Sequence, residues 1–172
     1  MTGLIRLLMC FLCLGLTLQV FSQTSASNNT LIGENWPRHR GCSELRGITK
    51  AKIGDGLKLD WFYETGDFLK SSPVVSEGLV FIGSDAGSLL ALSLNDGKEI
   101  WKFETTFGIE APPLVLDGVV YLGSTDGFLY AVKATNGKVI WKYETEGEIM
   151  GAANQAIRPK SKDSVIVVGS YD

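Results

Sequence analysis

Short apolar runs separated by turn-forming pairs make up most of the chain after residue 60. The runs span four to six residues and are rich in β-branched and aromatic side chains, as strands are. The pattern predicts strands over Ser72–Ser76, Leu79–Ser84, Ser88–Leu92 and Ile100–Glu104, and no segment has a helical period. The runs are separated by residue pairs in which an acidic residue or Asn precedes Gly. Such pairs tolerate the positive φ of tight turns. These pairs are Glu77-Gly78, Asp96-Gly97, Asp117-Gly118, Asp126-Gly127 and Asn136-Gly137.

The second strand of each set is apolar at every position, as in Leu79–Ile82 and again in Val119–Leu122. A strand with one solvated face alternates apolar and polar residues, whereas a continuous apolar run is typical of a strand buried on both faces. Each sheet is therefore expected to lie between two similar sheets.

Tryptophans recur at one regular interval, at Trp61, Trp101 and Trp141. Residues 61–100 aligned without a gap on residues 101–140 are identical at 15 of 40 positions. A third copy begins at Trp141 and regains Gly169, Ser170 and Asp172 after an insertion of about six residues, which we place in the polar loop Gln155–Ser164.

A repeat of about 40 residues with four antiparallel strands indicates a β-propeller blade. A β-sandwich, the alternative, would bury one face of each sheet and does not require such a repeat. The expected fold class is therefore all-β, a β-propeller of four-stranded antiparallel blades. We expect the repeated residues to be structural, because Trp fills the gap between blades and Gly allows strands to approach closely. These repeat positions are Trp61, Trp101, Trp141, Gly83, Gly123, Gly169, Gly87, Gly127, Gly97, Gly137, Ala91 and Ala131.

The repeats of residues 61–172 form an incomplete arc of roughly three blades. They amount to fewer than three full copies of the repeat, whereas closed propellers have about four to eight blades. We expect the ring to be completed by blades outside this sequence, or else by assembly of several chains, since either would cover the exposed edges.

Two pairs of segments resemble the PQQ-like (pyrroloquinoline-quinone-type) propeller repeat. They are Gly87–Leu92 with Asp96–Trp101, and Gly127–Val132 with Asn136–Trp141. The repeat has the pattern Gly-x-Leu-Tyr-Ala-Leu-Asp followed by Thr-Gly-x-x-x-Trp. In this chain Ser93 and Lys133 stand where Asp is usual, and Asp96 and Asn136 replace Thr. The resemblance covers Trp61–Asp172 and implies the fold without implying one activity.

The segment from Trp36 through Pro37 and Arg40 to Gly41 is similar to the Trp-Pro-x-aromatic-Arg-Gly lead-in of exported bacterial proteins with this repeat. His39 stands at the aromatic position. The resemblance implies that the lead-in packs on the propeller, with Trp36 as its anchor and Arg40 donating hydrogen bonds to backbone carbonyls. We assign His39 to no metal site, because it has no partner at ligand spacing.

The resemblance extends to two kinds of protein, quinoprotein dehydrogenases and non-enzymatic scaffolds. Quinoprotein dehydrogenases of this superfamily hold a quinone between a tryptophan and a vicinal disulfide, with Ca²⁺ bound by side-chain oxygens and an Asp as base. The sequence has no Cys-Cys pair and no haem, hydrolase or phosphate-loop motif, so we assign no catalytic, cofactor-binding or metal residue. Carboxylates that could line a channel are interpreted as solvated or structural; they are Glu64, Glu104, Glu110, Glu144 and Asp126.

The leading hypothesis is a non-enzymatic exported or periplasmic binding scaffold with other envelope proteins as partners, because the resemblance extends to the scaffold lipoprotein of outer-membrane β-barrel assembly. Enzymatic activity stays open. The alternative is a quinoprotein-type oxidoreductase whose PQQ and Ca²⁺ ligands lie outside this segment. A third class, a carbohydrate-binding propeller, depends on exposure of Phe107, Phe128 and Tyr130.

The charge balance argues against a nucleic-acid partner, and the first residues predict that the protein is exported. Sixteen Lys and Arg against 19 Asp and Glu leave no basic surface for nucleic acid. Residues 1–22 are predicted to be a signal peptide, because Arg6 precedes an apolar run over Leu7–Leu18 that is shorter than the roughly 20 residues of a membrane span. Cleavage is expected after Ser22, with Ala26 as the alternative site. No transmembrane span is then expected in the mature chain. Residues 23–60 are a linker and the lead-in, and Cys42 is expected to be a free thiol, or else bonded to a missing segment or partner.

Overall fold

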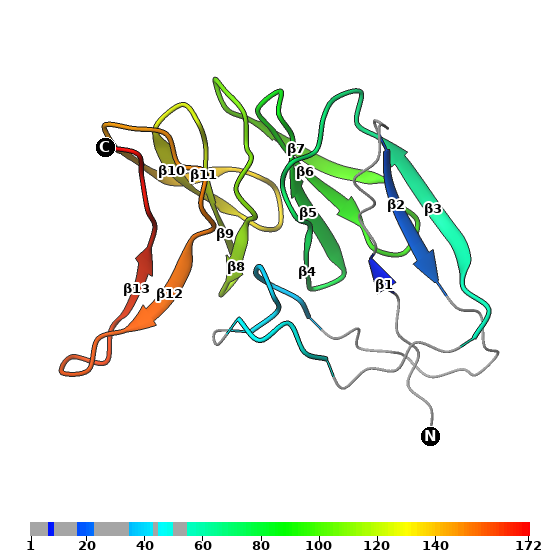
Figure 1. Ribbon diagram of the computed structural model, residues 1–172, viewed down its shortest axis with the longest axis horizontal. Coiled ribbons are helices and arrows are strands. Elements are labelled where there is room, and N and C mark those ends of the chain that lie inside the picture. The colour runs from blue at the N-terminus through cyan, green and yellow to red at the C-terminus, as the bar shows by residue number, and fades with distance from the viewer. Residues whose placement is uncertain (1–6, 9–16, 23–34, 43–44, 50–54) are drawn as a thin grey trace.

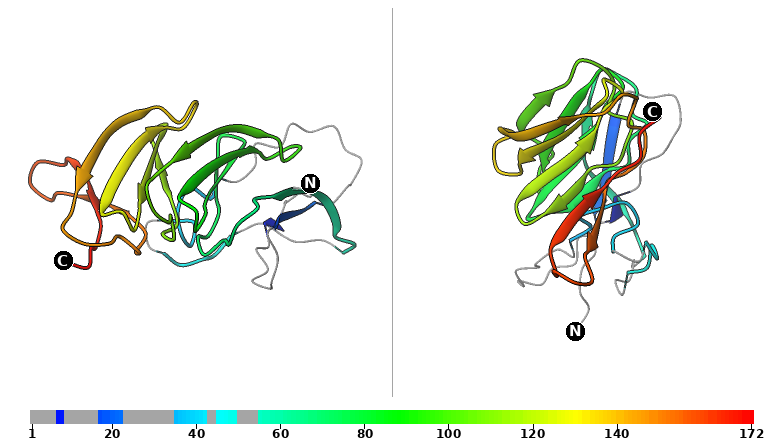
Figure 2. Two further views of the ribbon diagram at one scale, coloured as in Figure 1. Left: turned by 90° about the horizontal axis from the view of Figure 1, so that it is seen from above. Right: turned by 90° about the vertical axis from the view of Figure 1, so that its left-hand side faces the viewer.

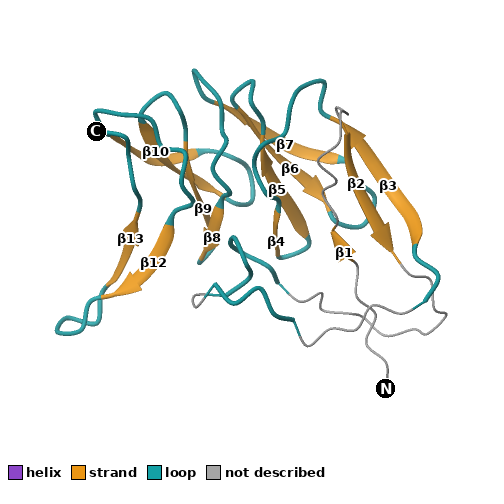
Figure 3. Cartoon of the chain, viewed as in Figure 1, coloured by secondary structure: helices purple, strands orange, loops and turns teal. Residues whose placement is uncertain are grey.

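The chain is built from strands. A computed structural model describes residues 7–8, 17–22, 35–42, 45–49 and 55–172, and this part of the chain contains no helix (Figure 1, Figure 3). Its strands form four separate sheets, none of which closes on itself. The prediction of an all-β, incomplete propeller is confirmed.

Two complete blades occupy the centre of the structure. Each is a four-stranded antiparallel sheet whose strands follow one another in sequence order. Blade 1 consists of β4 (Val74–Ser76), β5 (Leu79–Gly83), β6 (Ser88–Ser93) and β7 (Glu99–Glu104). Blade 2 consists of β8 (Leu114–Leu116), β9 (Val119–Gly123), β10 (Phe128–Lys133) and β11 (Val139–Glu144).

A smaller sheet flanks each side of this pair. Figure 1 and Figure 2 show the four sheets side by side in chain order. The N-terminal sheet consists of β1 (Leu7–Leu8), β2 (Thr17–Ser22) and β3 (Lys58–Glu64), and the C-terminal hairpin consists of β12 (Asn154–Ile157) and β13 (Ser164–Val167).

The pairing of β2 with β3 differs from what we expected, because residues 1–22 were assigned to a signal peptide outside the fold. In the structure Thr17 lies opposite Glu64, and Val20 lies opposite Trp61. The strand thus covers backbone groups of β3 that would otherwise form an open edge. Cleavage after Ser22 stays a prediction.

The four strands predicted for the first copy are confirmed to within two residues at each end. The first one, β4, begins at Val74 and not at Ser72, after Pro73, which has no backbone N–H to donate to a neighbouring strand. The inserted loop of the third copy is shorter than Gln155–Ser164, because these two end residues belong to the paired strands β12 and β13. The hairpin is closed by a hydrogen bond from the Arg158 N–H to the Asp163 carbonyl oxygen, at 2.9 Å.

The two-residue turns between the first and second strands have the predicted left-handed conformation. Glu77 and Gly78 have φ of 50° and 78°, and Asp117 and Gly118 have φ of 50° and 74°. Positive φ at both central positions is the type I′ turn, whose twist matches that of the flanking strands.

The hydrophobic core lies between the sheets. Phe81 and Ile82 are neighbours on β5 and both are fully buried, yet Phe81 packs toward blade 2 whereas Ile82 packs with Trp61 of β3. A third cluster, around Leu114 and Ile149, joins blade 2 to the C-terminal hairpin. This explains the continuous apolar runs, because both faces of β5 and β9 are covered.

Candidate functional site

The tryptophans at the repeat positions connect neighbouring sheets. Trp61 on β3 donates its indole N–H to the carbonyl oxygen of Leu94 in blade 1, at 3.0 Å, and Trp101 on β7 donates to Ala134 in blade 2, at 2.9 Å. Both side chains are more than nine-tenths buried. Trp141 stands at the same position of β11 but is 40% exposed, and it packs against Tyr121 of its own blade at 5.8 Å between ring centroids.

The repeated small residues make room for these contacts. Ala91 and Ala131 lie directly opposite Trp101 and Trp141 on the neighbouring strand, and the strand pairing shifts at both alanines. Gly97 and Gly137 hold positive φ in the turn that each preceding tryptophan covers, and a Cβ at Gly137 would lie 2.6 Å from the Trp101 ring. A side chain at either glycine would therefore displace the indole.

Two further glycines allow each blade to contact the loop that leads to the next. A Cβ at Gly83 would lie 2.5 Å from the carbonyl oxygen of Ile109, and a Cβ at Gly123 would lie 2.8 Å from the Cβ of Ile149. Gly87 and Gly127 accept hydrogen bonds through their carbonyl oxygens from the threonines that follow β7 and β11. Nothing lies within 4 Å of a Cβ at Gly169.

The lead-in runs across the first strands of three successive sheets (Figure 1). Trp36 exchanges two backbone hydrogen bonds with Val75 of β4, at 2.7 and 2.8 Å. The carbonyl oxygen of Pro37 accepts a bond from the N–H of Val115 on β8, at 2.7 Å. Arg38 donates to the side-chain oxygen of Gln155 on β12, at 3.2 Å. Positions 75, 115 and 155 are equivalent in the three copies of the repeat, so three adjacent residues of the lead-in each meet the same position of a different blade.

The buried guanidinium of the lead-in belongs to Arg38 and not to Arg40. Arg38 is only 7% exposed and its Nη1 has no hydrogen-bond partner, whereas Arg40 is exposed with φ of 59°. Gly41 has φ of 80°, and a Cβ there would lie 2.7 Å from the Trp36 ring, so the glycine is needed where the segment folds back on its anchor. Cys42 is a free thiol.

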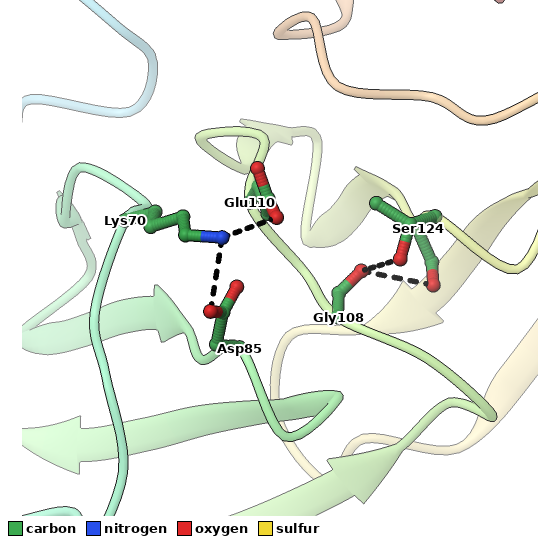
Figure 4. Close-up of polar contacts among 6 residues, drawn as sticks. Lys70, Asp85, Gly108, Glu110 and Ser124 are labelled. Atoms are coloured by element: carbon green, nitrogen blue, oxygen red, sulfur yellow. Dashed lines mark hydrogen bonds and ion pairs between the residues drawn. The ribbon is translucent and has the colours of Figure 1, made fainter.

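One ion-pair group joins the loops before β4 and β8 (Figure 4). The Lys70 ammonium lies 3.0 Å from Asp85 and 2.7 Å from Glu110. These two carboxylates raise the pKa of Lys70, the hydrogen bond to Glu110 contributing most. Lys70 and Glu110 occupy the same position of successive repeats, so equivalent positions of adjacent blades carry opposite charges. Because the Lys70 side chain is 54% exposed, the group sets local surface charge and adds little stability.

Of the other carboxylates considered from the sequence, Asp126 and Glu144 line one open cavity, whereas Glu64 and Glu104 are not part of its lining. Glu64, Glu104 and Glu144 end the outer strands β3, β7 and β11 and are exposed. Asp126 accepts hydrogen bonds from the Thr106 N–H at 3.1 Å and from the Tyr130 hydroxyl at 2.8 Å, so its role is to hold a loop and a ring in place.

The aromatic platform expected for a carbohydrate-binding propeller is not formed. Phe107 is 60% exposed, but Tyr130 is only 7% exposed and Phe128 is half-buried beneath the Lys142 ammonium, 4.2 Å from its ring centroid. The sequence did not reveal this because residues 128 and 130 point to the same face of β10, which blade 1 covers.

The described residues do not fit a quinone and Ca²⁺ site. Cys42 is the one cysteine among them, so they offer no vicinal disulfide, and they contain no group of three His, Cys, Asp or Glu side chains able to hold a metal ion. We therefore derive no reaction step through these groups. No helix in the described part is long and apolar enough to cross a membrane.

The four-stranded antiparallel sheets, with Trp61 docked on blade 1 and Trp101 docked on blade 2, define a β-propeller of PQQ-like repeats. A family model described as "Outer membrane protein assembly factor BamB" matches residues 41–171. The chain belongs to this family of PQQ-like propeller proteins.

Solved structures show the same fold. BamB from Moraxella catarrhalis superposes with a TM-score of 0.57 and 20% identity, over 74% of this chain and 42% of that one. The quinohemoprotein alcohol dehydrogenase from Comamonas testosteroni has a TM-score of 0.60 and 19% identity, over 83% of this chain and 24% of that one. The related enzyme ADHIIG from Pseudomonas putida HK5 has a TM-score of 0.61 and 22% identity, over 80% and 23%.

This chain spans less than half the length of each of these structures. No curated protein sequence matches it. At these identities the likeness establishes the fold, and it is shared by a protein-assembly factor and by enzymes.

Proposed function

We propose that the protein is a non-enzymatic binding scaffold of the cell envelope that is exported from the cytoplasm and contributes to outer-membrane protein assembly. The observation that carries the proposal is the family match over residues 41–171, whose model is described by that role. In agreement with it, the repeated threonines Thr105 and Thr145 donate hydrogen bonds to the carbonyl oxygens of Gly87 and Gly127 within their own blades.

The surface proposed to bind partners is the loop end of the blades, formed by residues 65–73, 84–87, 105–113 and 124–127. These loops contact one another through backbone hydrogen bonds, such as Ile109 N–H to Ser84 and Thr125 N–H to Gly108, so they form a continuous surface. It combines charged groups at Lys70 and Glu110 with the exposed ring of Phe107. An aromatic anchor surrounded by charged groups is a common composition for a protein interface.

Site-specific photo-crosslinking in cells that make the full chain would test this surface. A benzophenone amino acid replacing Phe107 should crosslink to an outer-membrane assembly component. The matched control replaces Ile100, which is 52% exposed on the outer strand β7, and should give no such product. Depletion of the protein should also lower the yield of folded outer-membrane barrels.

The competing function, a quinoprotein oxidoreductase, is tested by an activity assay. Oxidation of alcohols or sugars by the purified full-length protein, dependent on added PQQ and Ca²⁺, would establish a quinoprotein and overturn the scaffold proposal. Equal crosslinking from positions 107 and 100, together with unchanged barrel assembly, would equally contradict it.

A further inference from the structure

A cavity of about 350 Å³ opens between β3 and blade 1. Polar side chains make up much of its wall: Tyr63, Asp67, Ser84, Ser88, Glu99 and Lys102. Its volume falls at the lower end of the range of roughly 300–1,000 Å³ found for small-molecule sites.

The equivalent place between blades 1 and 2 is filled by side chains. Ala86, Ser88 and Leu90 line the cavity, and Asp126, Phe128 and Tyr130 replace them at the equivalent positions of the next repeat. There the Tyr130 ring packs edge-on against Phe103, at 5.3 Å between ring centroids, and lies tilted against Phe128, at 5.8 Å. The cavity therefore arises from three smaller side chains in blade 1 and is not a general feature of the fold.

One wall of the cavity carries an unmet hydrogen-bond acceptor. The Oδ2 atom of Asp67 is buried and has no hydrogen-bond partner. A buried carboxylate oxygen without a donor is costly, so such an atom favours a ligand that brings one. The residue equivalent to Asp67 in the next repeat is Phe107, whose side chain has no polar atom that needs a hydrogen-bond donor.

The remaining groups favour a ligand rich in hydroxyl groups. Glu99 accepts a hydrogen bond from the Tyr63 hydroxyl and, as a carboxylate, has capacity for more. Ser84 accepts from the Ser88 N–H at 3.2 Å, which leaves its own O–H hydrogen available to donate. The Lys102 ammonium is already paired with Glu104 at 2.9 Å. Acceptors and hydroxyls beside an aromatic ring suit vicinal O–H donors on an apolar carbon skeleton.

We propose that this cavity binds a monosaccharide-sized polyhydroxylated molecule. Asp67 and Glu99 accept hydrogen bonds from its hydroxyl groups, Ser84 donates to one of its oxygens, and the Tyr63 ring contacts its C–H face. The cavity adjoins the loop-end surface, to which Asp67 and Ser84 also belong. Sugar binding here does not depend on the scaffold function.

Titration calorimetry of the full chain with D-glucose, D-galactose, D-mannose and N-acetyl-D-glucosamine tests the proposal. At least one of these probes should bind saturably with a millimolar or lower dissociation constant. Asp67→Asn should weaken that binding by about tenfold, because it removes the charged acceptor. The control Asp117→Asn makes the same change in an exposed turn and should leave binding unchanged.

A triple variant, A86D/S88F/L90Y, closes the cavity with side chains that the next blade already accommodates. It should retain the wild-type circular dichroism spectrum and lose sugar binding. If the triple variant does not fold, Ser88→Phe alone provides the same test. Failure of all four sugars to bind saturably, or binding that the filled variant retains, overturns the proposal.

Discussion

Trp101 on β7 donates its indole N–H to the carbonyl oxygen of Ala134 in the following blade, 2.9 Å away. Trp61 makes the same contact with Leu94 one blade earlier. In both cases the donor lies on the last strand of one sheet and the acceptor lies in a turn of the next. Each repeat therefore contributes half of an interface, and a blade derives much of its stability from its neighbours, as in other repeat proteins.

Replacing the docked tryptophan should cost far more stability than replacing the exposed one. Trp101→Ala removes a buried ring and its hydrogen bond, so we expect a loss of about 3–5 kcal/mol in the free energy of unfolding. Trp141→Ala, at the equivalent but 40% exposed position, should cost less than about 1 kcal/mol. Urea unfolding followed by circular dichroism measures both, and equal losses would show that docking is not what stabilises the blades.

A methyl group at Gly83 should destabilise the contact between blade 1 and the loop before β8. Its Cβ would lie 2.5 Å from the Ile109 carbonyl oxygen, so the backbone must move, and we expect Gly83→Ala to cost about 1–3 kcal/mol. The control is Gly151→Ala, where nothing lies within 4 Å of the new Cβ and the change should be within about 0.5 kcal/mol. Thermal unfolding of the two variants distinguishes them, and a neutral Gly83→Ala contradicts the prediction.

Tyr63 should make stability depend on pH only in the alkaline range. Its hydrogen bond to Glu99, with further contributions from burial and the Glu99 charge, raises the pKa of Tyr63 from 10.0 to about 12. The unfolded chain loses the phenol proton near pH 10 while the folded chain keeps it, so stability conferred by Tyr63 is complete below pH 10.0 and is lost as pH rises toward about 12.

The matched variant for this effect is Tyr63→Phe, since Phe103 occupies the equivalent position in blade 1. The difference in unfolding free energy between wild type and Tyr63→Phe, measured against pH, should be constant up to pH 10 and then shrink. Phenolate absorbance supplies an independent titration. A difference that stays constant above pH 10 would falsify the assignment.

Detaching the lead-in should expose two particular amides. The Val75 and Val115 N–H groups donate to the carbonyl oxygens of Trp36 and Pro37, at 2.8 and 2.7 Å. Gly41→Val forces a side chain against the Trp36 ring and strains a residue at φ of 80°, so exchange of both amide hydrogens should rise by about tenfold or more.

Hydrogen exchange of individual amides provides the measurement and an internal reference. Val80 lies on β5 between two strands of blade 1, and its amide should exchange at the wild-type rate. Gly56→Val is the control variant, because Gly56 also has positive φ but has nothing within 4 Å of its Cβ position. Similar exchange at Val75 in the two variants would mean that the lead-in does not protect the blade edges.

Several features could be predicted because they depend on residues close together in the sequence. The strands follow from apolar runs bounded by pairs such as Asp117-Gly118, whose conformation is determined locally by the tolerance of Gly and Asp for positive φ. Burial of both faces of β5 follows from its continuous apolar run, confirmed by the full burial of Phe81 and Ile82.

Other features could not be predicted because they depend on side chains that meet from distant segments. The lead-in motif indicated Arg40 as the hydrogen-bond donor, but Arg38 is the buried residue, since it is the one that reaches Gln155, 117 residues away. The carbohydrate-binding alternative required an exposed Tyr130, but this ring is covered because Phe103 of the preceding blade packs against it.

By itself the sequence determined the repeat, the strands, their turns and the propeller class, because a regular repeat of this length admits few ways of burying so many apolar strands. The tertiary structure alone decided which junction between sheets is filled and which is hollow. Alignment of the repeats pairs Ser88 with Phe128 and Leu90 with Tyr130, but the consequence of those differences appears only where β6 and β10 face the sheet before them. Packing across such an interface depends on the combined volumes of side chains from both sheets, and no single repeat contains that information.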